Sequence, residues 1–540
     1  MNKFKNFLKR TGFDEKKFQL ECFEWCLERE TQGYNVTLAA LAEPALAEPA
    51  LAAAKIIKIH SAILALEMGL GKTIIMLGLI ECNFQRHTLI VLPRSLLDQW
   101  NKIIQKSFGH KPLIYHGSNP KCKNMTISEI KACPIIITTY GQISLPSAKQ
   151  IKRGKKQSIL LDLAWDRVIC DEAHHISHHK TNEYKGACLL RTKIIWLVTG
   201  TPIQNNLTEL YNLYSLLGLP ATYYINYDEA VKNFVFLRTK AGVGLPIPAL
   251  HEHTEILEWI NESERKFADH IHSFLPFCNI AQGAIAQQIT DEEGTKIVKI
   301  KYMTRARQVC LYPPVINKDI KYFKKLFAKD QKKNTDSYGL MNFPSIYRAD
   351  SKISAVVNTL IQRKNGNGKI VFCHYYSEID IFAKRLLLQG FTIAKFDGRV
   401  KNSDRARVLS EPVDVLLAQI KMCREGLNLQ DNYSEVYFPS PHFNPATEEQ
   451  AIARCWRIGQ KKSVYVFRYI MASTKKHIAQ QQEQAQQQEQ AQQQEQAADD
   501  YFPTYSLDGY SELLQVKKKI IIARLVSGGN PQTPPLGQAP

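Results

Sequence analysis

The sequence lacks the features that would place it in a membrane or stabilise it with disulfides. No apolar run approaches the length of about 18 residues that a transmembrane helix needs. Residues 1–5 lack the apolar core of a secretory signal peptide. The 12 cysteines are scattered and form no Cys-x-x-Cys pair. We therefore expect an intracellular protein with free thiols and no membrane contact.

Acidic residues are too few to balance the basic ones. The chain has 70 Lys and Arg against 51 Asp and Glu, which gives a formal net charge of +19. A chain this basic usually binds a polyanion such as nucleic acid, although a generally basic surface without such a partner gives the same composition. Its 540 residues, 44% of them hydrophobic, allow roughly two to four domains with sizeable cores.

A glycine-rich stretch predicts a phosphate-binding loop. The apolar residues 63–66 predict a buried strand, and Gly69, Gly71, Lys72 and Thr73 follow it at the start of an apolar helix. Glycines let the backbone approach a phosphate, and the N–H groups of a helix N-terminus bind its oxygens. The lysine adds charge at the β- and γ-phosphates, and the threonine hydroxyl binds Mg²⁺. A chance surface turn is the alternative for this stretch alone.

Four polar residues flank predicted elements near this loop in the sequence. Gln19 lies in an amphipathic helical pattern, where its amide could read an adenine edge or could be an ordinary exposed glutamine. Arg94 and Ser95 follow a short buried strand and begin a helix, an arrangement that suits a nucleic-acid phosphate. Thr139 closes a second β-rich run that ends in hydroxyl groups.

Residues 165–171 predict a strand that ends in a carboxylate, Asp171, and a second carboxylate, Glu172, follows it directly. Nucleotide hydrolysis needs both a metal and an oriented nucleophile. Asp171 is therefore expected to hold Mg²⁺ through a water molecule, and Glu172 is expected to polarise the attacking water. A zinc site is the alternative, but no cysteine spacing supports one among the nearby histidines, which are His174, His175, His178 and His179.

A fifth predicted strand, over residues 194–198, ends in the string Thr-Gly-Thr-Pro-Ile-Gln-Asn-Asn-Leu. Small hydroxyl and amide side chains at a strand end can link a nucleotide site to a bound nucleic-acid strand. The candidates for that contact are Thr201, Gln204 and Asn205.

Together these strings resemble the Swi/Snf-type (sucrose-nonfermenting-type) DNA-dependent ATPases of helicase superfamily two. Residues 69–73, 171–174 and 199–207 match the family's first, second and third motifs, residues 95–100 its motif Ia, and Gln19 its Q motif. The resemblance covers roughly residues 15–475. It implies an α/β fold with two RecA-like P-loop NTPase lobes, built of parallel sheets flanked by helices. These lobes would close on ATP and Mg²⁺ and move along duplex DNA.

Three residues depart from the family pattern. Leu66 stands where the family usually has Asp, and Cys423 and Arg424 replace the glycines usual before the fifth motif. The phosphate-binding residues are intact, so the resemblance still implies ATP binding. The substitutions before the fifth motif affect how closely that loop can approach DNA or nucleotide.

The second half of the chain supplies the remaining motif residues. Gly426 and Asn428 lie in the match to the fifth motif, which implies nucleotide and nucleic-acid contact respectively. Gln450, Arg454 and Arg457 lie in the match to the sixth. The two arginines are three residues apart, which predicts one helix face. An arginine presented across a cleft can neutralise charge that develops on the γ-phosphoryl group.

The expected domain order follows from these matches. We expect an N-terminal ATP-binding lobe over residues 1–220 with a low-complexity insertion at 38–54, and a C-terminal lobe over residues 346–475. A helical insertion or linker would occupy residues 221–345. Residues 476–540 contain a Gln-rich tract and a mostly disordered tail.

These expectations favour an ATP-driven translocase on double-stranded DNA that remodels protein–DNA complexes, acting as a monomer in a nucleus or a viral DNA factory. The alternatives are a strand-separating DNA or RNA helicase and a degenerate ATPase that serves as a DNA-binding scaffold. Some relatives carry a zinc-binding ubiquitin-ligase module between the lobes. The segment here has only Cys278 and Cys310, so we expect no zinc module.

Overall fold

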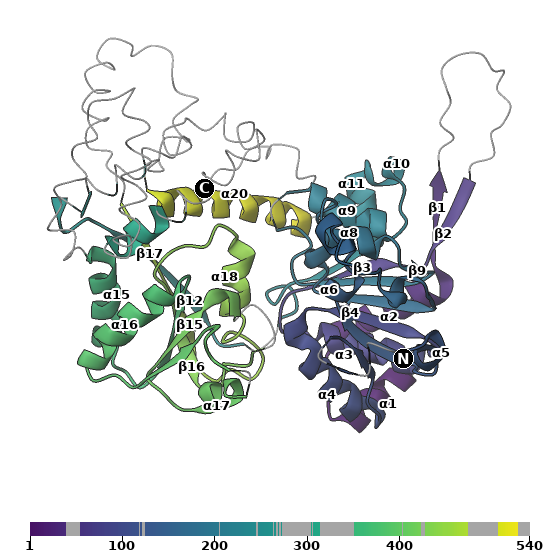
Figure 1. The fold of residues 1–540 in the computed structure, drawn as a ribbon, viewed down its shortest axis with the longest axis horizontal. Coiled ribbons are helices and arrows are strands. Elements are labelled where there is room, and N and C mark those ends of the chain that lie inside the picture. The colour runs from purple at the N-terminus through teal and green to yellow at the C-terminus, as the bar shows by residue number, and fades with distance from the viewer. Residues whose placement is uncertain are drawn as a thin grey trace, which may run out of the picture. The chain divides into compact units, whose positions relative to one another are not determined.

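The structure is a computed structural model, and the chain divides into two units, Met1–Pro246 with Lys518–Pro540, and Ile247–Lys517 (Figure 1). Four residues named in the sequence analysis, Asn205, Cys423, Arg424 and Gly426, lie outside the described residues, as do most of the low-complexity insertion and the Gln-rich tract. The described residues are 1–38, 55–117, 119–120, 122, 125–204, 206–244, 247–262, 264–265, 268, 272, 304, 306–313, 350–401, 403–422, 427–472 and 506–527.

A seven-stranded sheet forms the centre of the first unit. Every neighbouring pair of its strands is parallel. Most of these strands are continuous apolar runs, as expected of a parallel sheet that is covered on both faces. In spatial order the strands are β11 (Val235–Arg238), β3 (Ala62–Leu66), β10 (Ile195–Thr199), β8 (Arg167–Asp171), β4 (Thr88–Leu92), β6 (Ile135–Thr139) and β5 (Leu113–Tyr115).

Helices cover both faces of this sheet and divide its core in two (Figure 1). Alternate residues of β3 point to opposite faces, with Ile63 and Ala65 in one core and Leu64 and Leu66 in the other. One face is covered by α1 (Asn2–Thr11), α2 (Lys17–Gln32), α3 (Lys72–Cys82) and α4 (Leu97–Phe108). The other is covered by α6 (Tyr140–Ile143), α8 (Asn182–Ala187), α9 (Thr208–Leu216) and α11 (Tyr227–Phe234).

Smaller elements complete the first unit. An antiparallel ribbon, drawn apart from the main sheet in Figure 1, pairs β1 (Tyr34–Leu38) with β2 (Lys55–Ile59). The other short elements are β7 (Ala164–Trp165), β9 (Arg191–Thr192), α5 (Ile127–Lys131), α7 (Ala148–Ile151) and α10 (Ala221–Tyr224), with 3₁₀ turns at Arg94–Leu96, Ile159–Leu161 and Ala173–Ile176.

The second unit contains a six-stranded sheet whose neighbouring strands are also all parallel. Its order is β12 (Leu250–Leu257), β17 (Val464–Met471), β16 (Tyr433–Phe438), β13 (Gly368–Cys373), β15 (Val415–Gln419) and β14 (Ile393–Phe396). Helices α15 (Ser351–Gln362) and α16 (Tyr376–Leu388) pack on one face, and α17 (Arg405–Ser410) and α18 (Pro445–Ile452) on the other. The unit also has a 3₁₀ turn at Ile420–Met422 and the start of α20 (Leu507–Ser527).

The predicted fold class, α/β with two parallel sheets flanked by helices, is confirmed. The segment expected to be a helical insertion differs, because it begins with α10 and α11 but then contributes β11 to the first sheet and β12 to the second. β12 reads Leu-His-Glu-His-Thr-Glu-Ile-Leu and is exposed along most of its length, so it lacks the apolar signal of a buried strand. β5 is only three residues long and half-buried, and it forms the edge of the first sheet next to β6. No helix in the described ranges is long and apolar enough to cross a membrane.

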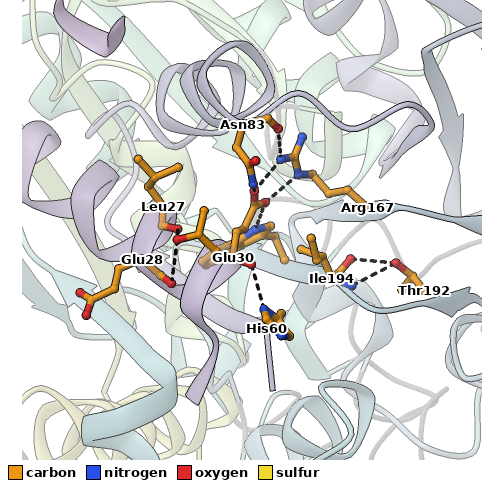
Figure 2. A network of polar contacts seen from close by, with 10 residues as sticks. Leu27, Glu28, Glu30, His60, Asn83, Arg167, Thr192 and Ile194 are labelled. Carbon is orange, nitrogen blue, oxygen red and sulfur yellow. Dashed lines mark hydrogen bonds and ion pairs between the residues drawn. The ribbon is translucent and has the colours of Figure 1, made fainter. Parts of the chain in front are cut away.

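A buried network of polar contacts joins four elements of the first unit (Figure 2). Arg167, at the start of β8, is 0% exposed, and Glu30, near the end of α2, is 4% exposed. Two hydrogen bonds join them, from Arg167 Nε to Glu30 Oε1 at 2.6 Å and from Nη2 to Oε2 at 2.5 Å. Asn83 after α3 and Trp196 on β10 donate to the same carboxylate at 2.8 and 2.7 Å. The carboxylate therefore fixes where two helices meet two strands.

We predict that Arg167→Met destabilises the protein by about 3–5 kcal/mol, because removing one partner leaves the Glu30 charge buried and unpaired. Urea unfolding followed by tryptophan fluorescence measures the loss. Lys5→Met is the matched control, since Lys5 pairs with Glu15 at 2.8 Å on the surface and surface pairs contribute about 0–1 kcal/mol. Equal stability of the two variants would contradict a structural role for the buried pair.

Candidate active site

The phosphate loop lies between β3 and α3, at the carboxyl edge of the first sheet. Gly69 and Gly71 adopt φ values of 90° and 89°, in a region that residues with a Cβ rarely occupy. A Cβ built on Gly71 would also displace the end of the Gln19 side chain, which packs directly against the loop. The N–H groups that begin α3 follow directly. This loop has the geometry that a phosphate cradle needs.

Lys72 and Thr73 begin α3 beside this loop. Lys72 Nζ donates to the carbonyl oxygen of Leu66 at 3.1 Å. A Cβ built on Gly200, in the loop after β10, would lie 3.2 Å from the same Nζ. The ammonium group therefore lies between the ends of β3 and β10. Because the acceptor is the main chain of Leu66, this contact does not depend on which side chain stands at that position.

Gln19, on α2, packs against the phosphate loop. It is 3% exposed, and its Nε2 donates to the carbonyl oxygen of Leu70 at 3.0 Å. Its Oε1 is buried without a hydrogen-bond partner among the described residues. One end of the amide is thus fixed on the loop, and the other retains an acceptor for a donor group of a ligand.

Asp171 and Glu172 lie at the carboxyl end of β8, as their spacing predicts. Asp171 Oδ2 accepts from Trp100 Nε1 at 2.8 Å, and its Oδ1 accepts from the main-chain N–H of Glu172 at 3.0 Å. Burial, with the charge of Glu172, raises the pKa of Asp171 to about 7, while the nearby Lys72 ammonium acts in the opposite direction. A cation beside Asp171 would favour its ionised form, so this carboxyl group fits a Mg²⁺ ligand.

The backbone of Glu172 is unusual. Its φ of 54° makes it the one non-glycine residue at positive φ in the described ranges. Such conformations cost free energy and occur preferentially at functional sites. Glu172 ends β8 and precedes the 3₁₀ turn Ala173–Ile176, so the left-handed residue turns the chain sharply at the strand end.

A path of polar contacts runs from Glu172 to the loop after β10. Glu172 Oε2 lies 3.4 Å from His174 Nδ1, and the same nitrogen lies 3.4 Å from Thr199 Oγ1. Thr199 Oγ1 accepts from the N–H of Thr201 at 3.1 Å. Gln204 Nε2 then donates to Thr201 Oγ1 at 3.4 Å. The structure thus brings the second and third matched strings into contact through His174, a residue to which the sequence had assigned no such role.

The other candidates for nucleic-acid contact in the first unit follow strands of the same sheet. Arg94 and Ser95 are exposed in the 3₁₀ turn after β4. Thr139, at the end of β6, is only 6% exposed. Because all strands of the sheet are parallel, the ends of β4, β6 and β10 share one edge with the phosphate loop. Burial and the charge of Arg94 together lower the pKa of His116, which places these two residues near each other.

In the second unit the structure corrects the predicted helix face for the two arginines. α18 ends at Ile452, and Arg454 and Arg457 follow it in turns. The carbonyl of Arg454 accepts from the N–H of Leu429 at 3.1 Å, so this turn contacts the residues that precede β16 (Tyr433–Phe438). Arg457 Nη1 donates to Asn428 Oδ1 at 2.5 Å. The fifth and sixth matched strings therefore meet, although not through a helix.

Two buried glutamines flank this turn, and only the second of them is bonded to it. Gln450, on α18, is 2% exposed, and neither of its amide atoms has a hydrogen-bond partner in the described part of the chain. Gln460 was not predicted to matter individually, but its side chain forms five hydrogen bonds. Its Nε2 donates to the carbonyls of Gln430, Tyr433 and Cys455, and its Oε1 accepts from the N–H groups of Lys461 and Lys462.

Comparisons with known proteins match a family model to each half of the chain. The SNF2-related domain model matches residues 18–232, and the Helicase conserved C-terminal domain model matches residues 351–459. The chain is 28% identical over 439 residues to the probable global transactivator of Orgyia pseudotsugata multicapsid polyhedrosis virus. The aligned region covers 76% of this chain and 82% of that protein.

Two cellular relatives are similar at comparable identity. ATP-dependent DNA helicase DDM1 of Arabidopsis thaliana is 25% identical, with 86% of this chain and 60% of that protein covered. DNA excision repair protein ERCC-6-like of Homo sapiens is 26% identical, with 76% and 38% covered. The chain thus spans most of the viral relative and a smaller share of the cellular ones. With both lobe models matched in order, the chain belongs to the Swi/Snf family of helicase-superfamily ATPases.

Proposed function

We propose that this protein is an ATP-driven motor that moves along double-stranded DNA and remodels protein–DNA complexes. The observation that carries the proposal is the contact path from Glu172 through His174 and Thr199 to Gln204. It joins a residue suited to activating water to a loop suited to touching nucleic acid. Hydrolysis and grip on a polymer would then depend on each other.

The first unit would hold the nucleotide. Gly69, Gly71 and the start of α3 bind the phosphates through main-chain N–H groups, and Lys72 neutralises the β- and γ-phosphates. Gln19 presents its unsatisfied Oε1 to the amino group of the adenine base.

A magnesium ion fits the donor groups present. The Thr73 hydroxyl and the Asp171 carboxylate are hard oxygen donors of the kind that Mg²⁺ prefers. When bound, Mg²⁺ supplies positive charge to the phosphate oxygens. Trp100 holds the Asp171 carboxylate in place from behind, and Glu172 orients the attacking water and accepts its proton.

The second unit would supply positive charge to the transition state. Arg454 and Arg457 stabilise charge that develops on the γ-phosphoryl group, and Gln450 and Gly426 complete the nucleotide contacts on that side. Because these groups and the phosphate loop belong to different units, the site is complete only when the lobes close. Alternation between closed and open lobes would alternate the grip on DNA.

The nucleic-acid track would follow the loops at the carboxyl edge of the first sheet and the residues that precede β16 in the second unit. Its expected contacts are mostly to phosphates, which supply affinity without reading sequence. The net charge of +19 favours such contacts. The residues proposed for them are Arg94, Ser95, Thr139, Thr201, Gln204, Asn205 and Asn428.

ATP turnover measured with duplex DNA, single-stranded DNA and RNA tests the proposal. We expect duplex DNA to stimulate the wild type most, and Lys72→Ala to lose both nucleotide binding and turnover. Glu172→Gln should keep nucleotide binding while kcat falls by roughly 100-fold or more, because the base is lost. Glu28→Gln, an exposed carboxylate on α2, is the matched control. Wild-type turnover no higher than that of Lys72→Ala would favour a DNA-binding scaffold instead.

A second assay separates translocation from strand separation. We expect the protein to displace a third strand from a triplex while leaving duplex DNA paired, because translocation along a backbone does not require unpairing. Triplex displacement and strand displacement are followed on the same fluorescent substrates with ATP. Unwinding of the duplex would instead support the strand-separating helicase, and Glu172→Gln controls for displacement without hydrolysis.

Thr199→Val tests the contact path itself. The change keeps the side-chain shape but removes the hydroxyl that meets His174 and Thr201. We expect stimulation by DNA to fall about tenfold with nucleotide affinity unchanged, because one polar link is worth about 1.4 kcal/mol when buried. Thr88→Val is the matched control, since Thr88 is also buried on this sheet and its hydroxyl has no partner in the described ranges. Equal stimulation in both variants would remove the path from the mechanism.

A further inference from the structure

The segment that leaves the first sheet after β11 is attached to the phosphate loop. Lys240 is 4% exposed, and its main-chain N–H donates to Glu67 Oε2 at 2.7 Å. Its ammonium group lies 3.2 Å from Glu67 Oε1. The N–H of Glu67 in turn donates to the carbonyl of Arg238 at 3.0 Å. Glu67 directly follows β3 and precedes Gly69 by two residues, so these contacts hold the entrance of the phosphate loop.

The segment stays on the first unit for several residues after Lys240. The N–H groups of Gly242 and Val243 donate to the side chain and carbonyl of Thr239, which closes a turn. Val243 packs against the core that also contains Leu66 and Leu70. The attachment therefore combines charge, hydrogen bonds and apolar contact.

Where it enters the second unit, the same segment is attached to the turn that carries Arg454 and Arg457, which we call the arginine turn. Trp456 Nε1 donates to the carbonyl of Pro248 at 2.8 Å. The N–H of Val464, at the start of β17, donates to the carbonyl of Ala249 at 2.9 Å. Trp456 lies between Arg454 and Arg457 in the sequence. Only residues 241–247 separate, in the sequence, the anchor on the phosphate loop from the anchor on the arginine turn.

A buried lysine is costly unless a carboxylate neutralises it. The Glu67–Lys240 pair should therefore persist when the phosphate loop changes conformation, so that a movement of the loop carries Lys240 with it. A connection this short has little slack to absorb such a movement.

We propose that Lys240 and Trp456 are positioning residues that fasten the interlobe connection at both ends, so that nucleotide in the phosphate loop sets the placement of the arginine turn. This inference rests on the proposed ATPase function. Neither residue touches the nucleotide. Each acts through a neighbour, Lys240 through Glu67 and Trp456 through the two arginines that flank it.

Lys240→Met and Trp456→Phe each release one anchor while keeping most of the side-chain volume. The matched controls are Lys232→Met, an exposed lysine on α11, and Trp259→Phe, which removes a similar bond from Trp259 Nε1 to the carbonyl of Ala472 at 2.9 Å. We expect each test variant to lower DNA-stimulated kcat about tenfold and to leave nucleotide Kd within about threefold of wild type. Both controls should match wild type.

The double variant Lys240→Met/Trp456→Phe distinguishes positioning from a merely structural role. Releasing either end should already free the connection, so the double variant should lose no more than the worse single variant. Two independent structural defects would instead multiply. The proposal is overturned if the losses multiply, if either single variant keeps wild-type kcat, or if nucleotide affinity falls in parallel with turnover. A different result, wild-type turnover no higher than that of Lys72→Ala, would refute the ATPase function itself, and it is distinguishable because it is seen without either positioning variant.

Discussion

The buried pair of Glu30 and Arg167 is the constraint on which the first unit depends. Arg167 opens β8, and the carboxylates Asp171 and Glu172 end it. Glu30 lies near the end of α2, which carries Gln19, and the same carboxylate binds Asn83, just beyond the helix that Lys72 begins. One charged cluster at the amino edge of the sheet thus orients elements whose other ends carry the candidate site. Such a pair contributes specificity of arrangement more than net stability.

The second unit uses a similar device. Glu435, near the start of β16, is 0% exposed and accepts from Arg363 and Asn365 at 2.8 Å each and from the Tyr437 hydroxyl at 2.7 Å. This cluster also lies at the amino edge of its sheet. The turn that carries Arg454 and Arg457 lies near the same edge, because it precedes β17 and the nearby Gln460 donates to the carbonyl of Tyr433, the first residue of β16. The two units therefore differ: in the first, the polar cluster and the candidate chemistry lie at opposite edges of the sheet, and in the second they lie at the same edge.

The sequence predicted the parts of the fold and site whose signal is local. Buried strands such as 63–66 and 194–198 are short apolar runs, and the phosphate loop is specified by glycines that few other residues can replace. The sequence did not predict β12, because this strand is polar and lies at the edge of its sheet, where pairing with β17 determines its conformation. The turn that carries Arg454 was predicted as helix because its contact with Leu429 is not visible in the spacing. Trp100 and His174 gain their roles only when distant elements meet.

The Leu66 departure shows how a local substitution can leave a site's geometry intact. The side chain at this position is fully buried, in the core that also holds Leu64 and Leu70. An aspartate there would bring a charge into that apolar core, at a large desolvation cost unless it were paired. Leucine avoids this cost, and the main-chain carbonyl still accepts from Lys72. The neighbouring Glu67 keeps the one carboxylate that the loop's attachment to Lys240 uses. The physical requirement at this strand end is therefore met by the backbone and by Glu67, which is why the phosphate loop retains its conformation without the family's aspartate.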